Sequence, residues 1–174
     1  FGCLAPYITF LNARETNDVW YTAVLPVTKR ENVLGKCLLV VFFQLFQLLF
    51  SIPFALLRNA MNIANNPVGL DATVAWYGFG FILYAVFDLV FLTTFYKSGY
   101  KVGKSFILAA IPMVFLMVAI EATSYFPALV WMDSYQPEHL VMQLPILIVG
   151  IIFYGAMLTL AYQISAMRYE KVDL

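Results

Sequence analysis

The chain has 174 residues, of which 63% are hydrophobic and only 11% are charged, and its mean hydropathy is +0.83. Ten Lys and Arg residues balance ten Asp and Glu residues, so the net charge is zero. A soluble domain of this length needs more charge on its surface, and a general nucleic-acid binder needs clustered basic residues. The composition therefore predicts a membrane protein.

The chain opens on an apolar segment, FGCLAPYITFL, which is shorter than the roughly 20 helical residues that cross a bilayer. It lacks the basic start and the small-residue cleavage site of a signal peptide. We expect it to be the end of a membrane span whose earlier part is missing from residues 1–174. The two cysteines, Cys3 and Cys37, both lie in apolar segments, which argues against a disulfide framework.

The longest polar stretch before the first complete span covers residues 12–36 and reads NARETNDVWYTAVLPVTKRENVLGK. It predicts a short helix over residues 19–24, which Pro26 would end because a proline disfavours helical geometry at the residue before it. The residues able to cap that helix are Thr16, Asn17 and Asp18. Its apolar residues, Trp20, Tyr21 and Leu25, either anchor the segment in lipid headgroups or dock against another protein.

A second helix is predicted to begin directly after this segment. Thr28 and Glu31 match a capping box, in which each side chain accepts a hydrogen bond from the other residue's backbone N–H. The helix that starts there should continue into the membrane.

Four apolar runs are long enough to cross about 30 Å of hydrocarbon. They cover approximately residues 37–57, 72–96, 105–126 and 144–167. Their internal prolines are compatible with membrane helices, in which neighbouring helices satisfy the freed carbonyls. The sequence thus predicts an all-α polytopic bundle, a single transmembrane domain over residues 1–174 with four complete spans and the end of a preceding one.

The positions of the basic residues predict the orientation, because cytoplasmic loops retain Lys and Arg. Nine of the ten basic residues lie in residues 12–36, 97–104 and 168–174, and only Arg58 lies in the segments between the other ends of the spans. Residues 12–36, 97–104 and 168–174 should therefore be cytosolic. The loops over 58–71 and 127–143 should face outward.

The stretch KSGYKVGKS, residues 97–105, ends like a phosphate-binding loop. Such a loop needs four residues between its two glycines and a preceding strand, whereas here three residues separate Gly99 from Gly103 and a membrane span precedes them. We interpret the stretch as a short basic turn. The chain should have no ATPase site of its own, and it shows no hydrolase pattern around its Ser and Cys residues.

Two carboxylates lie within the predicted spans. Asp88 should sit in the inner part of the membrane, paired with Lys36 or a neighbouring polar group, or else face a translocation path. Glu121 lies near the outer end of its span and can reach water. His139, with Glu138 and Asp133 nearby in sequence, fits an exposed loop better than a metal site, so no metal ligands are predicted.

The stretch LPVTKRENVLGK, residues 25–36, resembles the Leu-Pro-Val-Ser-Arg-Lys-Glu-Ile-Val-x-x-Lys signature between the second and third spans of ABC-2-type transporter permeases. The basic turn over residues 96–104 resembles the turn between their fourth and fifth spans. The chain departs from the signature at Thr28, where Ser is commoner, and at Asn32, where an aliphatic residue is usual. Within the family it is most similar to the permeases of phenol-soluble modulin exporters.

This resemblance implies a six-span subunit of the bacterial cytoplasmic membrane, of which the chain holds the end of span two and spans three to six. It implies a second permease, identical or not, and separate ABC ATPase subunits that bind ATP and Mg, while this chain binds no cofactor. The cargo would be an amphipathic or antimicrobial-type peptide or another hydrophobic compound. The ATPase-docking role would fall to Asn17, Asp18, Trp20, Tyr21, Leu25, Pro26, Thr28, Lys29, Arg30 and Glu31.

An ATP-independent carrier or a non-transporting membrane scaffold remains an alternative. The sequence leaves the substrate open, and it does not distinguish immunity from virulence or drug efflux.

Overall fold

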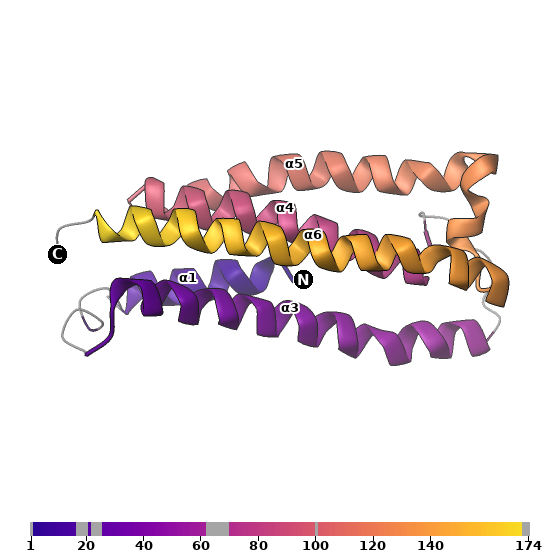
Figure 1. The fold of residues 1–174 in the computed structure, drawn as a ribbon, viewed down its shortest axis with the longest axis horizontal. Coiled ribbons are helices and arrows are strands. Elements are labelled where there is room, and N and C mark those ends of the chain that lie inside the picture. Colours follow the sequence, from indigo (N-terminus) through magenta and orange to yellow (C-terminus); the bar gives the residue numbers. More distant parts are fainter. Residues whose placement is uncertain (1, 17–20, 22–25, 62–69, 100, 172–174) are drawn as a thin grey trace.

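The computed structural model describes residues 2–16, 21, 26–61, 70–99 and 101–171 (Figure 1). These residues form a bundle of long helices with no strand among them. The elements are α1 (Leu4–Glu15), α3 (Lys29–Ala60), α4 (Val74–Lys97), α5 (Val102–Ala122), the 3₁₀ segments η1 (Thr123–Tyr125) and η2 (Pro127–Asp133), and α6 (Pro137–Glu170).

Four of these helices, α3 to α6, are long and apolar enough to cross a membrane, which confirms the predicted all-α polytopic bundle. The observed helices α3 and α6 are longer than the apolar runs because their first turns are built from polar residues. α3 begins at Lys29, directly after its capping residue, and α6 begins at Pro137, where a proline at the first helical position presets the backbone. The prediction of a loop over residues 127–143 is therefore wrong from residue 137 onward.

The predicted basic turn between the second and third complete spans joins α4 to α5. Lys97 ends α4, Gly99 has a positive φ of 66° that only glycine adopts without strain, and Val102 begins α5. Gly103 is helical, in the first turn of α5. The stretch that resembled a phosphate loop thus consists of two helix ends and a tight turn.

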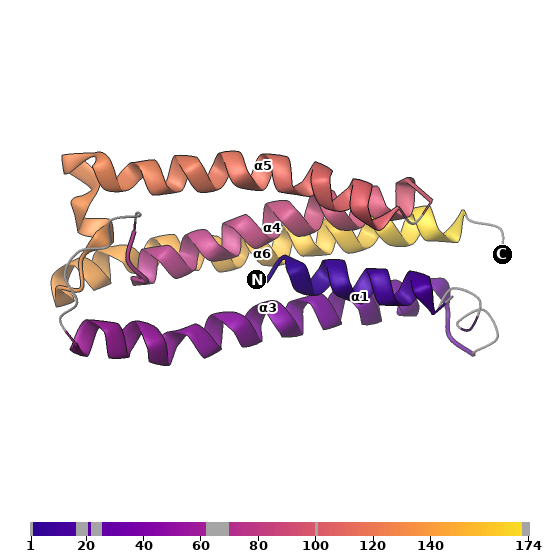
Figure 2. The ribbon, with the colours of Figure 1, turned by 180° about the vertical axis from the view of Figure 1, so that it is seen from behind.

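Helix α4 lies at the centre of the bundle, where it packs along both α5 and α6, while α3 packs against α6 (Figures 1 and 2). The short α1 begins halfway along the bundle and lies between α3 and α5 (Figure 2). Its Phe10 is fully buried, and the centroid of its ring lies 4.6 Å from the ring centroid of Phe95 and 5.4 Å from that of Phe91. This aromatic contact holds α1 against the core.

One end of the bundle, which we call the basic end, contains the C-terminal ends of α1, α4 and α6 and the N-terminal ends of α3 and α5 (Figure 1). Nine of the ten Lys and Arg residues lie in or next to these helix ends. Arg58, in the last turn of α3, lies at the opposite end, which we call the far end. The helix topology thus gathers the basic residues as the charge pattern predicts.

Helices α4 and α6 approach each other closely where glycine faces backbone. A Cβ atom added to Gly78 of α4 would lie 2.7 Å from the carbonyl oxygen of Ile146 in α6, and one added to Gly150 would meet the backbone of Gly78. Small residues allow membrane helices this approach, because dispersion contacts between the backbones then replace contacts with lipid. The α4–α6 pair is therefore the tightest part of the fold.

Candidate coupling site and buried polar network

The structure describes part of the predicted docking residues. Those it describes are Tyr21, Pro26, Thr28, Lys29, Arg30 and Glu31. Of the predicted helix over residues 19–24 the structure describes Tyr21 alone, while Asn17, Asp18, Trp20 and Leu25 lie outside the described residues. Tyr21 is 68% exposed, and Pro26 is also exposed. Among the described residues of the segment, Thr28 bonds to Glu31 in α3 and Arg30 bonds to Glu170 in α6.

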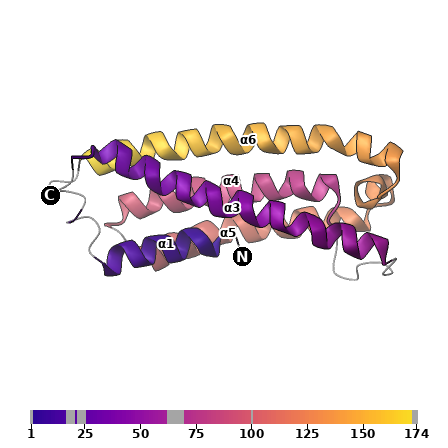
Figure 3. The same ribbon diagram turned by 90° about the horizontal axis from the view of Figure 1, so that it is seen from below.

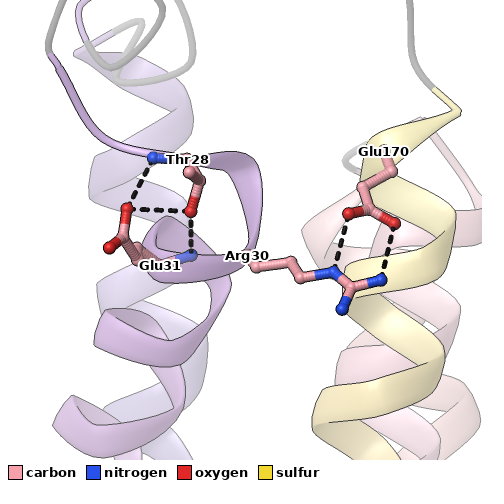
Figure 4. A network of polar contacts seen from close by, with 4 residues as sticks. All are labelled: Thr28, Arg30, Glu31 and Glu170. Atoms are coloured by element: carbon pink, nitrogen blue, oxygen red, sulfur yellow. Dashed lines mark hydrogen bonds and ion pairs between the residues drawn. The ribbon is translucent and has the colours of Figure 1, made fainter.

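The joint between the segment and α3 is a capping box, as predicted (Figure 4). The Thr28 hydroxyl oxygen accepts from the Glu31 N–H at 3.2 Å, and a Glu31 carboxylate oxygen accepts from the Thr28 N–H at 2.7 Å and from the Thr28 hydroxyl at 2.8 Å. These bonds satisfy backbone donors that the first turn of a helix leaves free. They also define the direction in which the preceding chain enters α3.

Arg30 links the start of α3 to the end of α6 (Figure 4). Its Nε lies 2.7 Å from one carboxylate oxygen of Glu170, and an Nη lies 3.2 Å from the other. This two-pronged geometry orients both side chains. Because they are 60% and 42% exposed, the pair adds little to the free energy of folding, but it does set the relative position of the two helix ends.

Tyr169, which precedes Glu170, extends this contact into the core. Its hydroxyl accepts from the side-chain amide of Asn32 at 3.4 Å, and the Lys29 ammonium lies 5.9 Å from its ring centroid. The buried ring packs on Tyr96 of α4, with centroids 5.5 Å apart. Asn32, the departure from the family signature, therefore makes a polar contact where an aliphatic residue would pack.

A second connection at the basic end joins α6 to α4 directly, because Arg168 donates a hydrogen bond to the backbone carbonyl of Thr93. The N-terminal end of α3 and the C-terminal parts of α4 and α6 are thus connected by contacts at the basic end. A displacement of the segment before α3 would act on all three helices.

A polar network crosses the middle of the bundle. Gln44 of α3 donates from Nε2 to a carboxyl oxygen of Asp88 in α4 at 2.9 Å and accepts from the hydroxyl of Tyr154 in α6 at 2.7 Å. Gln44 and Asp88 are fully buried. Each of these bonds joins two helices in a region without water, where an unpaired polar group is costly.

The partner of Asp88 is therefore a neighbouring polar group and not Lys36, the other candidate. The Lys36 ammonium lies instead 5.7 Å from the ring centroid of Phe10. Sequence reasoning missed Gln44 and Tyr154 as partners. The available signal was the pair of glutamines, Gln44 and Gln47, within a mostly apolar span, since a polar residue there usually faces a partner in the bundle.

Carboxylates organise the far end of the bundle. Glu121 accepts from the backbone N–H of Leu70 at 2.9 Å, so it holds the chain before α4. Asp133 accepts from the N–H of Asp71 at 2.5 Å, and Asp71 pairs with Arg58 at 2.8 Å. Burial raises the pKa of Asp133, and the nearby Asp71 charge adds to the rise.

His139, the only histidine, lies in the first turn of α6 next to Glu138. Within the described parts of the chain, no three His, Cys, Asp or Glu side chains are close enough together to hold a metal ion.

The fold and these networks define a multi-pass membrane protein whose spanning helices are tied together at both ends and in the middle. A family model described as ABC-2 family transporter protein matches residues 2–170, so the chain belongs to this family of transporter permeases. Searches of curated proteins and of solved structures gave no match. Membership implies a partner ABC ATPase, in agreement with the resemblance seen in the sequence.

Proposed function

We propose that this chain is the permease subunit of an ATP-driven exporter, and that a separate ATPase subunit docks on residues 17–31. ATP and Mg would bind to that partner, while this chain supplies the membrane path together with a second permease. The basic end would then face the cytosol, as its positive charge favours.

The connection between the docking segment and the spanning helices is the observation that carries this proposal. The capping box joins residue 28 rigidly to α3, and the Arg30–Glu170 pair joins α3 to α6. A segment that only anchored the protein in headgroups would not need contacts to two spanning helices. A segment that transmits movement from an ATPase would need them.

The cargo in this proposal is an amphipathic peptide or another hydrophobic compound. The resemblance to the permeases of phenol-soluble modulin exporters suggests it, and the apolar character of the spans is compatible with it. We propose no catalytic residue in this chain.

Co-purification with an ABC ATPase, sought first in the neighbouring reading frames, tests the docking role. The double variant Trp20→Glu, Leu25→Glu should lose the ATPase, because buried charge opposes an apolar contact. A control with the same two charges at exposed positions of the far end, outside the predicted spans, Asn59→Glu with Gln136→Glu, should retain it. Retention of the ATPase by the Trp20 and Leu25 variant would refute the docking assignment.

The Arg30–Glu170 pair provides a second, independent test. Glu170→Arg, a change outside the docking segment, should retain the ATPase but transport poorly in proteoliposomes, because the segment is docked but no longer tied to α6. Glu170→Asp keeps the charge that pairs with Arg30 and should retain most of the transport. Transport that proceeds without any ATPase would instead favour an ATP-independent carrier.

A further inference from the structure

Helix α3 is held unevenly along its length. Its buried residues, Val33, Cys37, Val40, Gln44 and Leu48, all lie in the half nearer the basic end or at the centre. None of the residues from Leu49 to Ala60 is buried. Figure 3 shows α3 starting beside the end of α6 and diverging from α6 toward the far end. The far half of α3 is therefore loosely packed against the other helices.

A half-open cavity of about 490 Å³ lies beneath this far half of α3. Its walls come from three helices, with Leu48 and Ile52 from α3, Tyr77 and Phe81 from α4, and Leu147 and Ile151 from α6. Nearly all of the lining is apolar. The volume lies within the range of about 300–1,000 Å³ that is typical of sites for small ligands.

The size of the cavity limits what can occupy it. One turn of an α-helix, about 10–12 Å wide with its side chains and 5.4 Å long, occupies roughly 400–600 Å³. The cavity is therefore too small for a helix of a second copy or for a whole helical peptide. It accommodates one hydrocarbon chain or the apolar side chains of about one helical turn.

Polar groups mark the end of the cavity nearest the far end of the bundle. Tyr135 and Ala72 line it there, and Asp71, next to Ala72, pairs with Arg58 at the end of α3. Within the cavity wall, the Tyr77 hydroxyl meets the Ser51 hydroxyl at 3.0 Å. An apolar body with polar groups at one end matches an amphipathic ligand whose polar head lies at the membrane surface.

The far half of α3 can move without disturbing the core. Pro53 removes one backbone hydrogen bond from the helix and permits bending at that point. Beyond Leu48, the contacts that tie this half to the rest of the described residues include the Ser51–Tyr77 hydroxyl contact and the Arg58–Asp71 pair, whose side chains are 34% and 19% exposed. The outward face of α3 carries a row of exposed phenylalanines that suit lipid contact, Phe42, Phe46, Phe50 and Phe54.

We infer that this cavity binds the apolar part of a single amphipathic molecule and that the far half of α3 is its movable wall, held closed by the Arg58–Asp71 pair. The inference deepens the proposed function, since it rests on that function in taking the ligand to be the cargo. Binding would occur in the leaflet at the far end, where the cargo leaves the permease.

Photolabelling of the full protein in nanodiscs tests the binding site. The probe is dodecylphosphocholine with a diazirine at the end of its tail, and the labelled residues are identified by peptide mapping. Ile151→Trp places an indole in the cavity, whereas Ile152→Trp, at the next residue, adds it to a side chain that is 65% exposed. We expect labelling of the cavity lining to fall at least about five-fold in Ile151→Trp and to be unchanged in Ile152→Trp.

Three results would overturn the inference. These are equal labelling of both tryptophan variants, labelling spread over the exposed faces of all helices, and equally efficient labelling of the cavity by a diacyl phospholipid carrying the same diazirine. The last result would mean that bilayer lipid occupies the cavity. The assay needs no ATPase, so its outcome is separate from that of the docking experiments.

The movable wall has its own test, in a variant with Cys3 and Cys37 replaced by alanine. Arg58→Cys with Asp71→Cys places two thiols where the ion pair stands, and a short cleavable bis-maleimide joins them. Cross-linking should reduce labelling of the cavity several-fold, and cleavage should restore it. Labelling that is unaffected by the cross-link would show that this wall does not move.

Discussion

The close contact between α4 and α6 predicts opposite effects for the same substitution at two glycines of this chain. In Gly78→Ala the new Cβ would lie 2.7 Å from the Ile146 carbonyl oxygen, a backbone atom that cannot rotate away. In Gly155→Ala, on the same helix as Ile146, the new Cβ would have no atom within 4 Å. The two variants differ only in whether the added methyl has room.

The expected magnitude follows from the geometry. Ordinary contact begins at 3.4 Å, so the helices must separate by 3.4 − 2.7, or about 0.7 Å. Overpacking of this kind costs about 1–3 kcal/mol, and the better helix propensity of alanine returns at most about 1 kcal/mol. We expect Gly78→Ala to lose about 1–2 kcal/mol of stability, a Tm decrease of roughly 2–8 °C. Gly155→Ala should keep its Tm or gain a few degrees.

The buried thiol of Cys37, which is 3% exposed, provides the assay. In a Cys3→Ala background, which removes the other free thiol, a fluorogenic maleimide reacts with Cys37 only when the bundle opens, so the temperature at which fluorescence rises reports unfolding in detergent or nanodiscs. Gly150→Ala should behave like Gly78→Ala, because its Cβ meets the Gly78 backbone. A Tm for Gly78→Ala equal to that of Gly155→Ala would refute the close contact.

Three further predictions concern the polar networks. Gln44→Leu leaves the buried Asp88 and Tyr154 groups without their shared partner and should lower the free energy of unfolding by about 1–3 kcal/mol for each group, measured by the same thiol assay. Gln44→Glu is not a suitable control, because it adds a charge. Thr28→Ala should cost about 1 kcal/mol through the lost cap, whereas Thr28→Ser should be nearly neutral; equal losses would contradict the cap. The raised pKa of Asp133 means that its protonated form favours the folded state, so this contribution is complete below its ordinary pKa of 3.8 and is lost as pH rises through the higher folded value. A Tm-against-pH profile should show that loss in the parent protein and not in Asp133→Asn.

Local patterns predicted the elements of this fold well. Hydropathy located four spanning helices, because each span must expose apolar side chains to lipid over its whole length. The capping box at Thr28 and Glu31 was readable because both partners lie within one turn of the chain. The basic residues predicted which helix ends lie together, because alternate ends of successive spans share one side of the membrane.

The polar contacts between helices could not be predicted from local sequence patterns. Asp88 bonds Gln44, 44 residues away, and Arg30 bonds Glu170, 140 residues away. Which polar groups meet depends on the rotation and crossing of whole helices, and hydropathy does not specify these. The cavity depends in addition on α3 diverging from α6, which no single segment encodes.

The sequence by itself thus determined a polytopic helical membrane protein, the limits of its spans to within about a turn or two, and the charge difference between its two ends. Each of these properties is set residue by residue through contact with lipid, water or the adjacent backbone. Only the tertiary structure decided that Gln44 is shared by Asp88 and Tyr154, that Gly78 and Gly150 bring two backbones together, and that half of α3 stands over a cavity. Those features arise where helices distant in the chain pack, and packing selects among partners that the sequence leaves equally available.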